Sequence, residues 1–577
     1  MLENKKIFNC DTLHEMFFYQ AKRNSSKPLL WFKKNNQYCP LTWKDIENKI
    51  KKISLEIKKI GIKNGDKVLI ISENNPNWFI ADFAIMAAGA ISVPAYTTYT
   101  EEDFKYIIND SEAKLAFISN QNLFETFIKA AENKKEIKNI ITFEKIKYKK
   151  KIKKIIYVEE IYKKKNNIKK NKTNNKKTDD ACIIYTSGTS GKPKGVVLTH
   201  KSILSNLRGS IDVFKKSILK NEKFISFLPL SHSYEHTAGQ FFPVAISSEI
   251  FYAENLDKLF TNIKEVNPTI ISAVPRLYET IYKKILNSIL KKNILIQKLF
   301  KINQKLGKIR YEEPKRYNFI QKFLKFFLSL IFDKKIKKIF GSNLKFLISG
   351  GGALSYEVNI FFESLGIQIL QGYGLTETSP TVSCNRPEFN KIGSVGTVIK
   401  GVNIKLAKDG EILVKGDSVM KGYWKQELET KKRIKNNWFY TGDIGEIDSD
   451  NYLKITDRKK DIIVTTGGDN IAPQKIENML TSKNEVSKVV IYGDDKPYLI
   501  ALIEINKDII NKSHAQETIH QIIKEINNKL TASEKIRKFI IVREDFTQEN
   551  GLLTPTMKIK KNIVFQKFRN QINNLYN

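Results

Sequence analysis

The chain has 577 residues, a length that allows several domains of about 150 residues each. Its hydrophobic content of 41% is enough for large cores, and its four cysteines form no Cys-x-x-Cys pair, which excludes a disulfide framework and a zinc ribbon. The N-terminal residues lack the apolar core of a signal peptide, and no apolar run reaches the ~18 residues that span a bilayer. We therefore expect a soluble, cytoplasmic, multidomain protein.

The charge balance is strongly basic, with 98 Lys and Arg against 61 Asp and Glu, a formal net charge of +37. Such a charge suits nucleic-acid binding, but it also arises when Lys fills solvated positions. Residues 145–177 contain fifteen Lys and two Glu with few aromatic residues among them, so they lack the stacking pattern of a nucleic-acid site. We expect no specific nucleic-acid partner, although a positive surface would attract anionic lipid and phosphate-bearing substrates.

Short β-rich runs alternate with helical stretches, which predicts an α/β fold with buried, largely parallel strands. The Lys- and Asn-rich stretch 145–177 between the second and third runs is predicted to be a linker or surface loop. In chain order, the predicted strands are residues 68–72, 113–118, 181–185, 224–227, 269–274, 344–349 and 368–370.

Residues 281–340 have Ile, Leu and Phe at helical spacing among Lys, and residues 326–332 (FFLSLIF) are their most apolar part. The favoured interpretation is a helical insertion packed on the core, and the alternative is a basic amphipathic surface that rests on a membrane. After about residue 400 the sequence changes to short strands separated by glycines. A charged joint at 457–461 then precedes a last segment whose length suits a small α+β domain.

A loop rich in glycine, hydroxyl groups and lysine follows the predicted strand 181–185. Glycine amides, hydroxyls and lysine charge together form an anion site, so this loop is predicted to bind phosphate. It differs from the common NTPase loop because Lys192 is followed by Pro193 instead of Ser or Thr. The predicted phosphate contacts are Thr186, Ser187, Gly188, Thr189, Ser190, Gly191 and Lys194.

A second cluster follows the strand at 368–370. Tyr373 offers a flat face for a purine, Thr376 a hydroxyl for phosphate, and Glu377 a hard oxygen for Mg²⁺. The glycine-rich segment 350–353 leaves backbone open to a flat ligand.

From about residue 10 to residue 565 the chain resembles the adenylate-forming (AMP-binding) acyl-CoA synthetases, and it is most similar to the bacterial long-chain fatty acid–CoA ligases. The resemblance rests on loop 185–196, on residues 228–236 (LPLSHSYEH), on 275–278 (PRLY) with the helical insertion after it, and on 553–558 (LTPTMK). It implies a large domain of layered α/β sheets over 1–456, with a β-rich part at about 390–456. A hinge at 457–461 and a small mobile α+β domain over 462–577 would follow.

The same resemblance assigns roles to individual residues. Lys558 would reach the α-phosphate during adenylation, Asp443 and Arg458 would bind the ribose, and His232 would border the acyl pocket. Thr376 and Glu377 would serve catalysis, Glu377 also as the Mg²⁺ ligand. The remaining nucleotide and CoA contacts would be Gly351, Gly352, Ala353, Gln371, Gly372, Tyr373, Gly374, Thr466 and Gly467.

The implied reaction uses ATP, Mg²⁺ and coenzyme A to convert a fatty acid to its acyl-adenylate and then to its CoA thioester. Two alternatives stay open. One is an enzyme of the same family that activates an acyl or aryl acid of another size, or that uses an acyl-carrier-protein thiol. The other is a basic membrane- or nucleic-acid-binding protein with a vestigial nucleotide site. Peripheral contact with the anionic inner face of a membrane is a further expectation, and the sequence indicates no oligomeric state.

Overall fold

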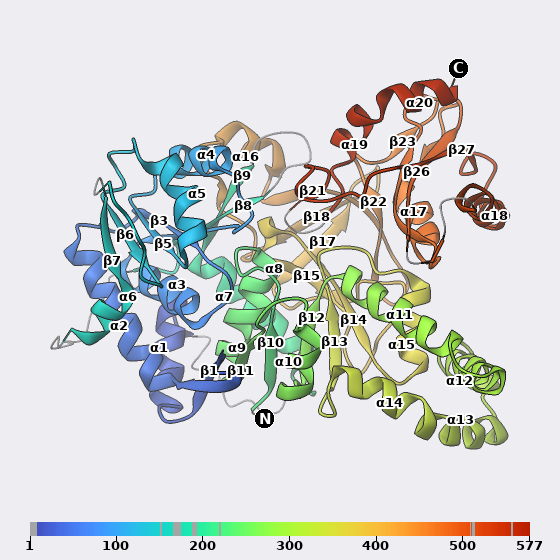
Figure 1. Ribbon diagram of the computed structural model, residues 1–577, viewed down its shortest axis with the longest axis horizontal. Helices are drawn as coiled ribbons and strands as arrows, with labels where there is room; N and C mark the ends of the chain where they lie inside the picture. Colours follow the sequence, from blue (N-terminus) through green and yellow to red (C-terminus); the bar gives the residue numbers. More distant parts are fainter. Residues whose placement is uncertain are drawn as a thin grey trace.

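The computed structural model describes residues 9–150, 153–164, 175–186, 193–217, 221–507, 509–510, 514–554 and 558–576. A large body of two α/β layers and a smaller β-rich part carries a small C-terminal unit on one side (Figure 1). This arrangement confirms the predicted α/β class with a small α+β C-terminal domain.

The first large sheet has eight strands in the order β19-β9-β8-β4-β3-β5-β6-β7. Its central strands are parallel and buried on both faces, which requires the continuous apolar runs seen in the sequence. Strands β8 and β9 form an antiparallel pair that flanks the predicted phosphate loop. The bounds are β3 (Lys67–Ile71), β4 (Ile91–Ala95), β5 (Leu115–Ile118), β6 (Asn139–Thr142), β7 (Lys154–Tyr157), β8 (Asp180–Thr186), β9 (Lys194–Thr199) and β19 (Gly422–Tyr423).

One expectation about the Lys-rich stretch 145–177 is wrong. Within it, β7 pairs in parallel with β6, and α6 (Val158–Lys163) follows directly. Ile156, Val158 and Ile161 are buried, so three apolar side chains hold this segment on the sheet, while Lys154 and Lys163 are exposed. Residues 165–174 of the same stretch lie outside the described residues.

The second large sheet has nine strands in the order β16-β15-β14-β13-β12-β10-β11-β1-β2, and the strands from β11 to β14 are parallel. The carboxyl ends of β12, β13 and β14 therefore meet at one edge, where α/β sheets bind ligands. The bounds are β1 (Pro28–Lys34), β2 (Gln37–Thr42), β10 (Lys223–Ser226), β11 (Glu249–Tyr252), β12 (Ile270–Ala273), β13 (Phe346–Ser349), β14 (Ile369–Gly374), β15 (Thr381–Cys384) and β16 (Thr397–Val398).

Helices cover both sheets. Helix α3 is buried along nearly its whole length, in keeping with its uniformly apolar sequence, whereas α2 turns one apolar face inward. Thr42 and Thr199 accept backbone hydrogen bonds that begin α2 and α7. The main helices of this body are α1 (Leu13–Arg23), α2 (Trp43–Lys59), α3 (Pro76–Ala88), α4 (Glu101–Ser111), α5 (Gln121–Ala131), α7 (His200–Phe214), α10 (Leu259–Val266) and α15 (Tyr356–Ser364).

A smaller antiparallel sheet links the large body to the C-terminal unit. It contains β17 (Val402–Leu406), β18 (Glu411–Gly416), β20 (Ile434–Lys435), β21 (Trp438–Ile447) and β22 (Leu453–Arg458). The C-terminal unit has two apolar cores of its own. Its elements are β23 (Ile463–Val464), β24 (Asn470–Ile471), α17 (Pro473–Thr481), β25 (Val486–Tyr492), β26 (Leu499–Ile505), α18 (Ala515–Asn527), β27 (Ile536–Ile541), α19 (Lys561–Lys567) and α20 (Arg569–Tyr576).

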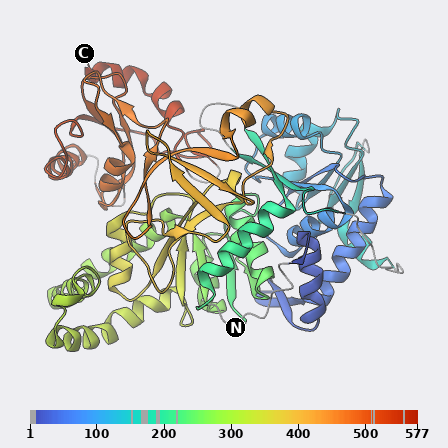
Figure 2. The same cartoon turned by 180° about the vertical axis from the view of Figure 1, so that it is seen from behind.

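The predicted insertion is helical and lies at the outer edge of the molecule in both ribbon views (Figures 1 and 2). It consists of α11 (Pro275–Leu290), α12 (Ile294–Glu312), α13 (Phe319–Ile331) and α14 (Asp333–Lys337). The expected packing on the core holds for α11 but not for α13, whose large apolar side chains are mostly exposed. Each described helix is too short or too polar to cross a lipid bilayer.

Candidate active site

Three of the predicted nucleotide-binding residues meet where the second large sheet adjoins the smaller one. The Tyr373 hydroxyl on β14 donates to Asp443 Oδ2 over 2.7 Å, and Arg458 Nε lies 3.3 Å from Asp443 Oδ1. Asp443 and Arg458 face each other in register on β21 and β22. Burial and the adjacent Asp443 carboxylate hold the pKa of Tyr373 well above its usual value, so this hydroxyl remains a hydrogen-bond donor.

The irregular part of β21 that carries Asp443 is fixed by its own sequence. The Asp443 amide donates to Thr441 Oγ1 over 3.0 Å, and the Thr441 hydroxyl donates to the Ile412 carbonyl over 2.7 Å. Gly442 has a φ of +75° and donates its amide to Glu411 Oε1 over 2.8 Å. Asp443 is 5% exposed, so a preformed carboxylate lies ready for hydroxyl donors without a change in this part of the strand.

Thr376 and Glu377 lie in a short 3₁₀ turn directly after β14. The Thr376 hydroxyl is 2.9 Å from Ser233 Oγ, and the Tyr423 hydroxyl donates to Glu377 Oε1 over 2.9 Å. Gly374 permits this turn, because a Cβ there would lie 1.9 Å from the Pro380 carbonyl oxygen.

The Glu377 carboxylate fits a magnesium ion that is bound mainly through ATP. Among the described residues Tyr423 engages Oε1, which leaves Oε2 as a hard oxygen ligand. Across the same residues no group of three or more His, Cys, Asp and Glu side chains could hold a metal ion. Mg²⁺ commonly takes one or two carboxylates plus substrate phosphates, so a single acidic residue suits it.

The glycine-rich strip follows β13 at the same sheet edge. Gly350 is buried beneath Tyr234, and a Cβ on it would come within 2.9 Å of the Tyr234 ring. Gly351, Gly352 and Ala353 are exposed, so their backbone is open to a flat ligand. Gln371 is buried next to the strip and accepts the Leu354 amide over 3.3 Å, and Gly372 pairs with Cys384 on β15.

The structure describes only the two ends of the predicted phosphate loop. Thr186 ends β8 and Lys194 begins β9, and the two residues pair across the ladder. Lys194 Nζ is 2.8 Å from Glu429 Oε2, so a carboxylate on α16 (Glu427–Arg433) compensates its charge. Ser187, Gly188, Thr189, Ser190 and Gly191 lie outside the described residues.

Lys558 comes from the C-terminal unit and lies in the field of the nucleotide cluster. Lys558 is exposed, yet the surrounding protein is dense enough that desolvation is the main cause lowering its pKa to about 8. The Arg458 and Lys460 charges lower this pKa further, while Asp443 opposes them. The backbone of Lys558 is held by Thr554, which accepts its amide over 3.0 Å. The charges of Asp443 and Arg458 thus act on the Lys558 ammonium, although no hydrogen bond or ion pair joins it to them among the described residues.

His232 lies near enough to Lys558 for the lysine charge to act on its ring. Its Nδ1 accepts the Tyr234 amide over 3.1 Å, which begins the short helix α8 (Ser233–Glu235) and places the ring proton on Nε2. Desolvation and the Lys558 charge lower the pKa of His232 to about 4, so the ring is a neutral donor near pH 7. His236, by contrast, is a core residue paired with buried Asp82 over 2.9 Å.

Thr466 and Gly467 are not brought to this cluster. They lie exposed in the turn between β23 and β24, where the Thr466 amide donates to the Lys496 carbonyl over 3.1 Å. Among the described residues, no interaction joins this turn to Asp443 or Lys558. A contact with CoA in a second placement of the unit remains a prediction.

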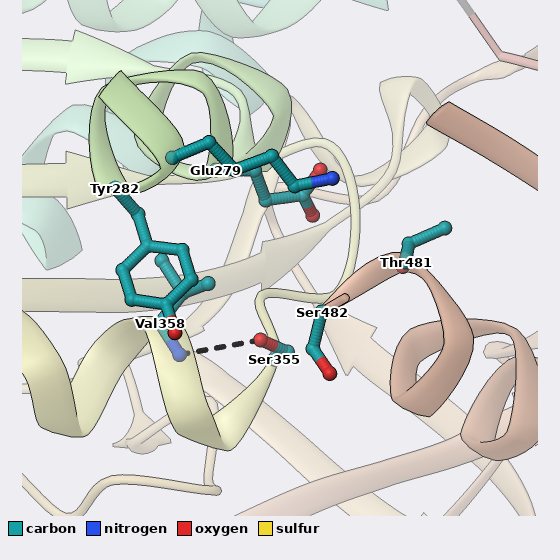
Figure 3. A pocket seen from close by; sticks show the side chains of 7 residues that line it. Glu279, Tyr282, Ser355, Val358, Thr481 and Ser482 are labelled. Atoms are coloured by element: carbon teal, nitrogen blue, oxygen red, sulfur yellow. Dashed lines mark hydrogen bonds between the residues drawn. The ribbon is translucent and has the colours of Figure 1, made fainter. Parts of the chain in front are cut away.

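The C-terminal unit is docked on the large body by helix α11. Lys283 Nζ donates to the carbonyls of Lys483 and Val486 over 3.1 and 2.8 Å, and Arg276 donates to the Ser487 carbonyl over 3.0 Å. Figure 3 shows Glu279 and Tyr282 of α11 facing Ser482 of the unit across a gap. The gap has no room for a water molecule, so it is a packed junction and not a substrate site.

Sequence reasoning missed several residues that organise the site. Ser233 lies within the segment quoted for the resemblance, so its hydroxyl could have been proposed as a site residue before its contact with Thr376 was seen. Tyr423 and Glu429 follow a segment with no recognisable pattern, and only their spatial closeness to Glu377 and Lys194 reveals them. Lys283 was one lysine among many in a helical region.

Solved structures share this architecture along nearly the whole chain. The anthranilate CoA ligase AuaEII, solved with anthranoyl-AMP, has a TM-score of 0.77 at 18% identity and covers 97% of this chain and 98% of its own. The adenylation domain of a carboxylate reductase from Mycobacterium chelonae has a TM-score of 0.80 at 18% identity, covering 99% and 92%. The fold is therefore that of the adenylate-forming enzymes.

Sequence comparison specifies the family. Residues 17–424 match the AMP-binding enzyme family and residues 460–577 match the AMP-binding enzyme C-terminal domain. The chain belongs to the AMP-binding enzyme family.

Several curated relatives are similar over most of their length. Long-chain-fatty-acid–CoA ligase FadD15 of Mycobacterium bovis is 31% identical over 568 residues, which cover 94% of this chain and 93% of the relative. Long chain acyl-CoA synthetase 3 of Arabidopsis thaliana is 26% identical, covering 97% and 91%. The chloroplastic long-chain-fatty-acid–[acyl-carrier-protein] ligase AEE15 of the same plant is 29% identical, covering 93% and 84%.

Proposed function

We propose that the protein activates a long-chain fatty acid with ATP as an acyl-adenylate and transfers the acyl group to coenzyme A, releasing AMP and pyrophosphate. The observation that carries this proposal is the Tyr373–Asp443–Arg458 cluster, whose charges act on the Lys558 ammonium of the C-terminal unit. The fatty-acid class is supported by the 31% identical ligase, which is named for long-chain fatty acids.

The first step needs no protein nucleophile, because a carboxylic acid is ionised at neutral pH. One carboxylate oxygen attacks the α-phosphorus of ATP, the bond to the bridging oxygen breaks, and pyrophosphate leaves. In this proposal Asp443 accepts ribose hydroxyls, Tyr373 lies against the adenine, and Thr376 contacts phosphate. The chain's task is to align the two reactants and to compensate developing charge.

Lys558 supplies a cation to the α-phosphate as negative charge develops there. A magnesium ion on Glu377, when bound, would neutralise phosphate charge. His232, with its proton on Nε2, can donate to a carboxylate oxygen of the fatty acid and hold it in line for attack. These three groups come from separate elements and address different oxygens of the reacting pair.

In the second step the CoA thiol attacks the acyl carbonyl carbon, the carbon–oxygen bond to AMP breaks, and the thioester forms. The adenylate is a mixed anhydride that water would hydrolyse, so a covered site is needed between the steps. A second placement of the C-terminal unit would withdraw Lys558 and bring Thr466 and Gly467 toward the CoA channel. The contacts of Lys283 and Arg276 support the first placement.

An acyl-carrier-protein thiol is a second candidate acceptor, and the 29% identical relative AEE15 favours considering it. The experiment that tests the proposal measures AMP and pyrophosphate released by purified protein across acids from short to long chain and an aryl acid. Each acid is assayed without acceptor, with CoA and with acyl carrier protein.

We expect turnover that depends on a long-chain acid and is strongly stimulated by CoA. Stimulation by the carrier protein but not by CoA would show that the carrier-protein thiol, instead of CoA, is the acceptor. Preference for an aryl or short acid would overturn the substrate class. Tight, salt-dependent RNA binding without ATP consumption by any acid would favour a protein with a vestigial site.

A further inference from the structure

Helix α13 has its apolar side chains on the outside. Phe319, Ile320 and Phe326 are 80%, 75% and 59% exposed, whereas Lys325 is only 3% exposed and faces the protein. The arrangement is the inverse of a surface helix in a water-soluble domain, where the apolar stripe faces the core. The large apolar side chains exposed on this helix are Phe319, Ile320, Phe323, Leu324, Phe326, Phe327, Leu330 and Ile331.

A buried polar network fixes this orientation. Lys325 Nζ lies 2.8 Å from Asp333 Oδ2 and 2.7 Å from Asn303 Oδ1, and Asn303 also donates to Asp333 Oδ1 over 2.7 Å. Rotating the helix to bury its phenylalanines would break both Lys325 interactions and leave the Asp333 carboxylate and the buried Asn303 side-chain oxygen without their cation. The outward apolar face is therefore part of the folded structure.

The rings on this face lie against one another. Phe327 contacts both Phe323 and Phe326 edge to face, with ring centroids 4.8 and 5.6 Å apart. Contiguous exposed apolar surface of this kind marks a site of interaction with a protein or a membrane.

The surroundings of α13 are strongly basic. Residues 291–338 contain fifteen Lys and Arg and three Asp and Glu. Lys322 on the helix, Lys315 and Arg316 before it, and Lys334 and Lys335 after it are exposed. Aromatic and aliphatic side chains flanked by lysine are the composition of helices that lie in the interface of an anionic bilayer.

The position of the helix suits a flat partner. Both ribbon views place α13 at the outer rim of the molecule, away from the small C-terminal unit (Figures 1 and 2). A rim helix can lie along a bilayer while the rest of the chain stays in water. We propose that α13 is an interfacial anchor that inserts its phenylalanine-rich face into the headgroup region of an anionic lipid bilayer.

The test is co-sedimentation of the full chain with vesicles of phosphatidylcholine alone or mixed with phosphatidylglycerol, at low and high salt. The test variant replaces Phe323, Phe326 and Phe327 by Ser. A matched control replaces Leu256, Phe389 and Leu428 by Ser, because these residues are 67%, 64% and 75% exposed elsewhere on the surface. Both variants remove exposed side chains, so neither is expected to disturb the fold.

We expect the wild type to bind the anionic vesicles, and to bind less at high salt and on neutral vesicles. The α13 variant should bind at least about tenfold more weakly and the control should bind like wild type. Equal binding by wild type and the α13 variant would overturn the proposal, as would no binding of the wild type to anionic vesicles. A wild-type dimer that the α13 variant converts to monomer, without vesicle binding, would assign the face to a second copy instead.

Membrane binding by α13 does not depend on which acid the enzyme activates. ATP–pyrophosphate exchange with a dissolved acid should be the same in the α13 variant and the wild type. A loss of exchange together with normal vesicle binding would count against the proposal, because it would give α13 a role in the catalytic body instead of at a membrane.

Discussion

The nucleotide cluster and Lys558 belong to one site but are built in different ways. Asp443 and Thr376 are held by hydrogen bonds to neighbours within the large body, so their geometry exists before ATP arrives. The position of Lys558, in contrast, depends on how the C-terminal unit docks on the large body. That docking uses the contacts of α11 and the segment after Arg458. In the proposed mechanism the fixed part would set nucleotide affinity, and the docked part would set which of the two reactions can occur.

The largest effect is expected for Lys558→Ala. Losing a cation at the developing α-phosphate charge should slow adenylation by about 10²–10³-fold. Thioester formation from supplied acyl-adenylate should remain close to wild type, because that step does not use Lys558. Lys560→Ala is the matched control from the same basic segment, with both reactions near wild type. Equal loss of both reactions in Lys558→Ala would remove the distinction between the fixed and docked parts.

Asp443→Ala should affect the fixed part. It removes the proposed ribose acceptor and the partner of the Tyr373 hydroxyl, a charged hydrogen bond whose loss is worth roughly 10–100-fold. The expected result is a higher KM for ATP measured by pyrophosphate exchange. Asp448→Ala is the control, since Asp448 pairs with Lys391 on the surface of the same strand region. An unchanged KM for ATP would show that Asp443 does not contact the nucleotide.

The pH dependence of adenylation tests whether Lys558 acts through its positive charge or only through the size of its side chain. The pKa of Lys558 is lowered to about 8 and its charged form is the active one, so activity is present below this pKa and is lost above it. We expect kcat/KM for ATP in adenylation to be flat near pH 7 and to fall about tenfold per unit at higher pH. Lys558→Arg should move this fall to higher pH. The same falling limb in both proteins would assign the titration to another group.

The smallest effect is expected at the domain junction. Lys283→Met removes the donor to the Lys483 and Val486 carbonyls. Losing these hydrogen bonds should lower the equilibrium constant for docking by about two- to tenfold. Adenylation should drop by a few-fold, while thioester formation should hold or rise. Lys284→Met is the control, because the Lys284 ammonium lies over the Phe260 ring and, among the described residues, makes no hydrogen bond or ion pair with the C-terminal unit. Parallel changes in both reactions would show that this contact does not favour one placement.

Most buried parallel strands, such as β3, β5, β10, β12 and β13, and the position of the glycine-rich loop after β8 could be predicted, because each depends on a local pattern of apolar runs or of dense glycine and hydroxyl residues. The buried strands β4, β6 and β11 were not predicted. Strand β7 was not predicted because its apolar pair, Ile155 and Ile156, lies next to lysines and is too short to stand out as a strand. The direction of α13 could not be predicted either. Its spacing shows an apolar face, but only the distant Asn303 and Asp333 determine which face turns inward.

In the site, too, single residues could be predicted from the sequence but their contacts could not. Tyr373, Asp443 and Arg458 were identified one by one, mostly by resemblance, yet their contact joins strands of two different sheets. Partners such as Glu429 and Tyr423 have no signature of their own, because a compensating carboxylate or hydroxyl can come from any element that folds alongside.

The most direct test of the central claim follows an oxygen atom. A fatty acid carrying ¹⁸O in both carboxylate positions is converted with ATP and CoA, and the AMP formed is analysed by mass spectrometry. Attack of the carboxylate on the α-phosphorus, followed by thiol attack at carbon, predicts one ¹⁸O atom in each AMP and none in pyrophosphate. Unlabelled AMP, or label in inorganic phosphate with ADP as the product, would contradict adenylation at this site.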